Sequence, residues 1–220
     1  MKLVMFDIDG TLTESYEYDE ALFQKAIRET LKIENFSLNW KDYKYVTDSG
    51  ILNEIVNKEK SRDISKEELA QVRATFVGYI KGLYENDNNF FKAVNGAIPL
   101  INELVKRSDI AVAVATGGWE ESALFKLEKS GFNLDGIPFA SSKDSYDRVK
   151  IMQIAEDRAK SFYGVENFQK TYYVGDGEWD LKASSDIGYE FVGIGEKLSK
   201  KGLSMHLNDF EGDLFFEYIE

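Results

Sequence analysis

The chain has 220 residues, of which 27 are Lys or Arg and 39 are Asp or Glu, and its formal net charge is −12 at pH 7. At this length roughly 70% of the unfolded surface is buried on folding, so a core with one sizeable insertion needs no disulfide or structural metal. So acidic a surface repels phosphodiester backbones, and we expect no nucleic acid partner. The sequence has no cysteine and one histidine, His206, which excludes thiol nucleophiles and Cys/His zinc sites and leaves carboxylates as the candidate reactive groups.

The first apolar stretch of the chain is short. It covers residues 3–6 and is ended by Asp7, which makes it far too short for a signal peptide or a membrane span. We therefore expect no membrane contact and a cytoplasmic location.

Continuous apolar runs predict strands that are buried on both faces, as in a parallel sheet. Helical patterns separate the later runs, including one that ends at Gly131 and one over residues 151–159. The predicted strands cover residues 2–6, 110–115, 137–140, 172–174 and 189–194. Alternation of strand and helix predicts the α/β class, with a Rossmann-like parallel sheet flanked by helices.

Residues 15–89 interrupt this alternation with helical patterns and no convincing strand. Helices are predicted near residues 19–31 and 49–58, and from Ser65 to about residue 83. The third helix opens with a capping box, in which Ser65 and Glu68 satisfy each other's backbone amides. We therefore expect residues 15–89 to form an inserted all-helical domain, and residues 1–14 and 90–220 to form the α/β core.

Two carboxylates follow the first predicted strand. Asp7 and Asp9 stand two residues apart, so strand alternation sends them to the same side, and Gly10 allows the backbone to turn sharply. In open α/β sheets, ligands bind at the carboxyl ends of the strands. A solvated Asp-Gly turn is the alternative interpretation.

Two further motifs follow later strands. Residues 175–180 (GDGEWD) place Asp176 at the same edge as Asp7, where the two carboxylates could share a hard divalent cation. Residues 116–118 (TGG) end the second predicted strand and offer a hydroxyl and backbone amides to an anion. A purely structural turn is the alternative for the Gly-Gly pair.

The chain carries three motifs in a fixed order: the DxDGT string of residues 7–11, the Thr-Gly motif and the later GDxxxD string. Together they resemble the motifs of the haloacid dehalogenase-like (HAD) superfamily. Most members of that superfamily are Mg²⁺-dependent phosphohydrolases. The resemblance covers nearly the whole chain, including a helical cap between the first strand and the Thr-Gly motif, and is strongest to the phosphoglycolate phosphatase and β-phosphoglucomutase-like group.

The resemblance implies a role for each motif residue. Asp7 matches the nucleophile, Asp9 matches the general acid/base, and Thr116 and Gly117 match the position that binds the phosphoryl group. The substrate expected from the family is a small phosphorylated metabolite.

The resemblance also implies Mg²⁺ as the cofactor. Its expected ligands are the carboxylates of Asp7 and Asp176 and the backbone carbonyl of Asp9, with Asp180 as a supporting acidic residue.

The family further requires a basic residue ahead of the fourth strand, and here the sequence departs from the common form, a Lys followed by a Pro-rich turn. Lys143, Arg148 and Lys150 are the candidates. We favour Arg148, because it begins a predicted helix and because Arg suits bidentate contact with phosphate. An exposed helix lysine is the expected state of Lys150.

Other functions remain as alternatives. A sugar phosphomutase of the β-phosphoglucomutase type keeps both aspartates and the cap, so it is the main enzymatic alternative. A non-catalytic HAD-like binding protein would belong to a different class, and the intact motif residues count against it. Dehalogenases usually lack the aspartate that matches Asp9.

The cap offers no clear specificity signal. Residues 47–50 (TDSG) could present hydroxyls and amides to the site, but Thr47 or Asp48 could equally cap the following helix. Tyr16 and Tyr18 lie at the junction of cap and core, where hinge packing is the alternative to specificity. We expect a monomer or a weak homodimer.

Overall fold

The computed structural model describes residues 1–220, except for the side chains of Tyr16 and Glu17, so the expectation for Tyr16 lies outside the described residues. One sheet runs through the molecule in the order β3-β2-β1-β4-β5-β6, and each neighbouring pair of strands is parallel. The strands are β1 (Lys2–Phe6), β2 (Ile110–Ala115), β3 (Phe139–Ala140), β4 (Thr171–Gly175), β5 (Glu190–Ile194) and β6 (His206–Leu207). The predicted α/β fold class is confirmed.

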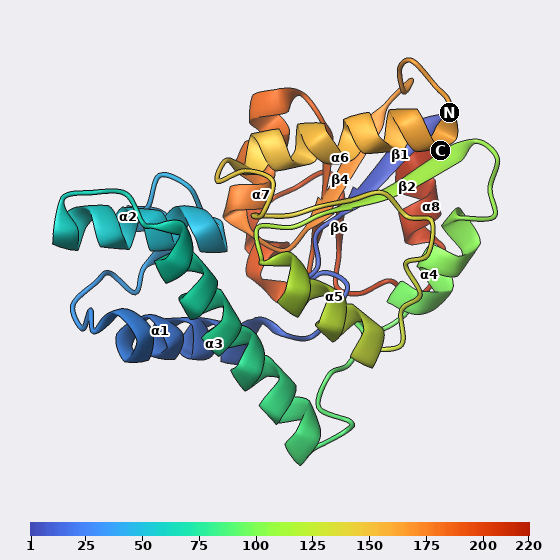
Figure 1. The fold of residues 1–220 in the computed structure, drawn as a ribbon. Helices are drawn as coiled ribbons and strands as arrows, with labels where there is room; N and C mark the ends of the chain where they lie inside the picture. The colour runs from blue at the N-terminus through green and yellow to red at the C-terminus, as the bar shows by residue number, and fades with distance from the viewer.

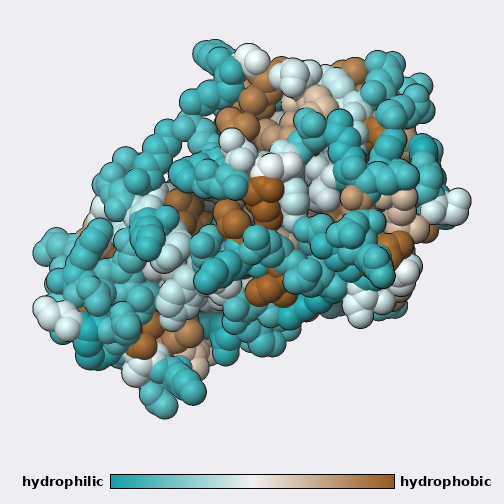
Figure 2. Space-filling view, turned by 90° about the horizontal axis from the view of Figure 1, so that it is seen from above, coloured by the Kyte–Doolittle hydropathy of each residue, from teal (hydrophilic) through white to brown (hydrophobic). Residues whose placement is uncertain are grey.

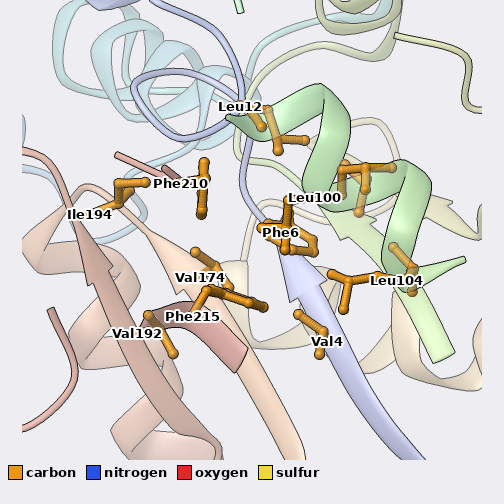
Figure 3. Packing of buried hydrophobic residues seen from close by; sticks show 14 of the residues in the cluster. Val4, Phe6, Leu12, Leu100, Leu104, Val174, Val192, Ile194, Phe210 and Phe215 are labelled. Carbon is orange, nitrogen blue, oxygen red and sulfur yellow. The ribbon is translucent and has the colours of Figure 1, made fainter. Parts of the chain in front are cut away.

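The two faces of the sheet form separate hydrophobic layers. Alternation along β1 sends Val4 and Phe6 into one layer and Leu3 and Met5 into the other. The first layer includes side chains of α4 (Ala97–Leu104), α5 (Glu120–Lys129) and α8 (Leu214–Ile219), and Figure 3 shows part of it. The second includes side chains of α6 (Arg148–Tyr163) and α7 (Glu178–Ile187). Both faces are therefore covered, which explains why the strands are apolar throughout.

β3 is shorter than predicted. The apolar run of residues 137–140 includes Pro138, which has no N–H to donate to a neighbouring strand. The Pro138 carbonyl still accepts from the Val114 amide at 2.8 Å, but the strand itself covers only two residues.

Three helices make up the inserted segment: α1 (Tyr16–Leu31), α2 (Asp48–Lys60) and α3 (Lys66–Asn86). Figure 1 shows them gathered on one side of the sheet. The predicted capping box is present, because Ser65 Oγ accepts from the Glu68 amide and Glu68 Oε2 accepts from the Ser65 amide, both at 3.1 Å. The short 3₁₀ helix η1 (Trp40–Asp42) lies between α1 and α2, and η2 (Glu196–Lys201) follows β5. The inserted all-helical cap is thus present.

A buried aromatic side chain of the core packs within the cap. Trp119 comes from the core, just before α5, yet it packs in the hydrophobic cluster of the cap helices. Its ring centroid lies 5.4 Å from that of Phe23 and 5.5 Å from that of Phe76. Its indole N–H donates to Ser49 Oγ at 2.9 Å. The cap is therefore held directly over the loop that follows β2.

The surface is mainly polar. Charged residues make up 30% of the sequence, and the face in Figure 2 is largely hydrophilic with small, separate hydrophobic areas. Among the described residues, no helix combines the length and the apolar character of a membrane span.

Candidate active site

The motif residues meet at the carboxyl ends of three adjacent strands. Asp7 follows β1, Thr116 follows β2 and Asp176 follows β4, and β1 lies between the other two strands. The chain places β2 and β3 on one side of β1 and then returns to place β4, β5 and β6 on its other side. Open α/β sheets form their binding crevices at such a reversal of strand order. Side chains of all three residues line one cavity of about 110 Å³, which cap residues also line.

Three buried carboxylates gather at this edge of the sheet, and two of them, Asp7 and Asp176, line the cavity. One oxygen from each of Asp7, Asp176 and Asp180 lies within 4.8 Å of the others. Burial, followed by repulsion from Asp180, raises the pKa of Asp7 well above its usual range. Burial likewise raises the pKa of Asp176, and that of Asp180 to about 6. Asp180, predicted only to support the site, is thus a third potential ligand.

This donor set fits a hard divalent cation. The oxygens are carboxylates, which Mg²⁺ and Ca²⁺ prefer, and the buried Asp176 Oδ1 has no hydrogen-bond partner. A cation would also relieve the repulsion that raises the pKa of Asp7.

Gly10 allows the backbone to pass very close to this cluster. Its φ is +79°, and a Cβ at this position would lie 2.3 Å from Asp176 Oδ2. The same oxygen accepts from Lys197 Nζ at 2.9 Å. Lys197 could not be predicted from the sequence, because it lies in η2, outside every motif.

Arg148 reaches the same cluster from α6. Asp147 caps that helix by accepting from the Val149 amide at 3.0 Å, which fixes Arg148 as its first residue. Arg148 Nη1 donates to Asp180 Oδ1 at 2.7 Å and lies 3.4 Å from Asp7 Oδ1. Its Nη2 donates to the carbonyl of Val46 in the cap at 3.2 Å.

The other two basic candidates lie outside the cavity. Lys143 is about half exposed and pairs with Glu120 at 3.1 Å, and Lys150 is exposed. The geometry therefore favours Arg148 over both lysines, and its contact with phosphate stays a prediction.

The Thr-Gly-Gly turn lies against the guanidinium. Thr116 Oγ1 accepts from the Gly118 amide at 3.0 Å, so its own proton can be donated to an anion in the cavity. A Cβ at Gly117 would lie 2.2 Å from Arg148 Nη2. Glycine at this position therefore lets a hydroxyl, backbone amides and a cation converge.

Asp9 points to a different partner, the buried Lys126 of α5. Asp9 Oδ1 accepts from Lys126 Nζ and from Ser15 Oγ, and Lys126 also donates to Asp19 of α1. The Lys126 side chain is only 2% exposed. Burial alone would raise the pKa of Asp9, but the Lys126 ammonium outweighs this effect and lowers that pKa. The carboxylate of Asp9 is thus held ionised, and its predicted metal contact through the carbonyl stays a prediction.

Residues 47–50, the N-cap and first turn of α2, combine both roles that the sequence left open. Thr47 caps α2 by accepting from the Gly50 amide at 3.2 Å. Asp48 lines the cavity and accepts from the Trp119 amide at 2.9 Å. Burial raises the pKa of Asp48 to about 7. Tyr18, in contrast, packs on Phe90 with ring centroids 4.7 Å apart, and its role as hinge packing stays a prediction.

A protein-family model gives the first comparison. The model described as hydrolase, haloacid dehalogenase-like hydrolase, matches residues 1–188. No curated protein matches the sequence.

Solved structures resemble the chain over nearly its full length. A hydrolase from Pseudomonas syringae is 20% identical, with a TM-score of 0.73 over 100% of this chain and 99% of that one. A β-phosphoglucomutase from Clostridium difficile is 19% identical, with a TM-score of 0.68 over 99% and 94%. A predicted phosphoglycolate phosphatase from Haemophilus somnus is 17% identical, with a TM-score of 0.62 over 100% and 98%. At these identities the likeness establishes a shared fold.

Proposed function

The chain belongs to the haloacid dehalogenase-like hydrolases, and from this premise we propose that it is a Mg²⁺-dependent phosphohydrolase that cleaves a small phosphate monoester through an aspartyl-phosphate. The observation that carries the proposal is the convergence of Asp7, Thr116, Arg148 and Asp176 on one cavity. A nucleophile, an anion-binding turn, a guanidinium and a metal-ligating carboxylate are the groups that phosphoryl transfer requires.

In the first step, a carboxylate oxygen of Asp7 attacks phosphorus in line, and the bond from phosphorus to the ester oxygen breaks. Thr116 and Arg148 lie where they can donate to the equatorial oxygens. Asp9 would donate a proton to the departing alkoxide. Bound at Asp7, Asp176 and Asp180, the metal would supply positive charge that neutralises the transferring phosphoryl group.

In the second step, water attacks phosphorus of the aspartyl-phosphate, which releases phosphate and restores Asp7. Asp9 would accept the proton of this water. The ion pair with Lys126, which lowers the pKa of Asp9, suits this base role better than the acid role of the first step.

The β-phosphoglucomutase-like fold favours a second candidate function, a sugar phosphomutase. The two candidates differ in where the phosphoryl group goes. We expect inorganic phosphate from several small esters with Mg²⁺ and without a bisphosphate activator, measured by a phosphate-release assay. Conversion of a sugar 1-phosphate to its 6-phosphate, with little phosphate released, would favour the mutase.

Arg148→Ala should lower kcat/KM by about 10²–10³-fold, because it removes one electrostatic stabiliser of the transferring phosphoryl group. Lys143→Ala and Lys150→Ala serve as matched controls and should change the rate only a few-fold, because both lysines lie outside the cavity. Steady-state kinetics with one ester and saturating Mg²⁺ would measure all three. A larger loss in Lys143→Ala than in Arg148→Ala would move the assignment to the loop lysine.

We further propose that residues 15–89 form the cap domain and residues 1–14 and 90–220 the core domain. Support comes from the separate hydrophobic cluster of α1, α2 and α3, which the core enters with Trp119. The cytoplasmic location and the monomeric or weakly dimeric state stay predictions.

A further inference from the structure

We propose that the cavity selects phosphate esters whose leaving group carries an ammonium cation, that is, small amino-alcohol phosphates. This inference rests on the proposed phosphohydrolase function and concerns the part of the cavity formed by the cap, where the leaving group would lie.

The two cations of the cavity are already engaged by protein groups. Lys126 is buried between Asp9 and Asp19. Arg148 contacts Asp180, Asp7 and the carbonyl of Val46. A carboxylate or a second phosphate on the leaving group would therefore have to displace a buried ion pair.

The cap contributes three carboxylates to the cavity, from Asp19, Glu20 and Asp48. Among the described side chains, neither Glu20 nor Asp48 forms a salt bridge, and Asp19 shares Lys126 with Asp9. Asp19 Oδ1 is buried and has no hydrogen-bond partner. Burial raises the pKa of Asp48 to about 7, and a cation beside this carboxyl would favour its negatively charged form. A ligand cation would compensate this charge, a neutral polyol would not, and an anion would add to it.

Aromatic side chains also contribute to this wall. Phe23, Trp40 and Phe76 line the cavity, and the Phe23 and Trp40 rings meet edge to face with centroids 5.9 Å apart. Aromatic faces attract ammonium groups and also contact the methylenes that carry them. At about 110 Å³, the cavity suits a leaving group of few heavy atoms.

The test compares esters of matched shape. Ethanolamine phosphate would be paired with n-propyl phosphate, and choline phosphate with 3,3-dimethylbutyl phosphate, which replaces the cation by a neutral group of the same shape. Phosphoglycolate provides an anionic leaving group, and nitrophenyl phosphate reports phosphohydrolase activity itself. We expect kcat/KM for at least one cationic ester to exceed that of its neutral partner by about tenfold, and phosphoglycolate to be the slowest of the alkyl esters.

Two variants test whether the carboxylates cause this preference. Asp19→Asn and Asp48→Asn should each reduce the ratio of kcat/KM between cationic and neutral partners several-fold. Asp135→Asn is the matched control, since Asp135 is exposed and precedes β3, away from the carboxyl ends of the strands. It should leave the ratio unchanged.

The outcomes separate this inference from the proposed function. If nitrophenyl phosphate is hydrolysed but the neutral or anionic esters match or exceed the cationic ones, the cation preference is wrong and the phosphohydrolase stands. An unchanged ratio in both Asp19→Asn and Asp48→Asn would likewise overturn it. If no ester is hydrolysed with Mg²⁺, the proposed function fails and the inference fails with it.

Discussion

Asp7→Asn is expected to lower ester hydrolysis by on the order of 10⁴- to 10⁶-fold, because the residue supplies both the attacking oxygen and a metal ligand. Phosphate release in excess Mg²⁺ would measure the loss. The amide is nearly isosteric, so the cavity should keep its shape, and Arg148 keeps its closer partner Asp180 at 2.7 Å.

The stability of the same variant provides a control that does not depend on activity. Burial and Asp180 raise the pKa of Asp7 in the folded protein above its value in the unfolded chain. Ionised Asp7 therefore destabilises the metal-free fold, and this destabilisation grows as the pH rises above the pKa that Asp7 has in the unfolded chain. Asp7→Asn removes that charge, and its metal-free melting temperature at pH 8 should exceed that of the wild type. Asp135→Asn, at an exposed position, should leave it unchanged.

Metal binding should reverse the order of stability. At one hundred times the Kd, Mg²⁺ stabilises a protein by about 2.7 kcal/mol, or about 5–10 °C for a chain of this size. We expect such a rise in the wild type and a much smaller one in Asp7→Asn. Robust hydrolysis by the wild type in excess chelator, without a Mg²⁺-dependent rise in melting temperature, would contradict a metal-dependent mechanism.

Much of the fold could be predicted because its strands are buried on both faces. β2 lies between β3 and β1 and consists of six buried apolar residues, so its pattern is unambiguous. β6 escaped prediction because two residues cannot show a period, and it is recognised only by its pairing with β5. In this strand, Nε2 of His206 lies 2.9 Å from the Gly195 carbonyl oxygen.

The strand-end residues of the candidate site could be predicted for a similar reason. Asp7, Thr116 and Asp176 each follow a recognisable strand, and parallel strands bring their carboxyl ends to one edge. Lys126 could not be predicted. Its partners Asp9 and Asp19 are 117 and 107 residues away in sequence, so nothing local distinguishes it from an exposed helix lysine.

The contact between Trp119 and Asp48 could not be predicted, because it joins the cap to the core. The sequence places Trp119 after a glycine turn and Asp48 at the start of a helix. Each position is explained by its sequence neighbours, so neither residue indicates a distant partner. Only the packed structure brings the Trp119 amide 2.9 Å from Asp48. We expect the substrate specificity of this protein to depend on how the cap is positioned over the core, which local patterns do not encode.

The last prediction concerns Asp9→Asn, which should separate the two chemical steps. An alkyl ester leaves as a strongly basic alkoxide and needs a proton in the transition state, whereas nitrophenolate barely does. The first step should therefore slow by about 10²–10⁴-fold for alkyl esters and far less for nitrophenyl phosphate. The second step needs a base for every substrate, and the Lys126 ion pair, which lowers the pKa of Asp9, holds it in the basic form.

With nitrophenyl phosphate, Asp9→Asn should consequently accumulate protein that carries one phosphoryl group on Asp7, detected by intact-protein mass spectrometry at acid pH. Lys126 keeps Asp19 as a partner in this variant, so the cap should remain in place. Ser15→Ala is the matched control, because it removes one hydrogen bond to Asp9 and leaves the carboxylate, and it should slow both steps modestly without trapping phosphoenzyme. If Asp9→Asn slowed both ester types equally and never trapped phosphoenzyme, Asp9 would serve to orient its neighbours rather than to transfer protons.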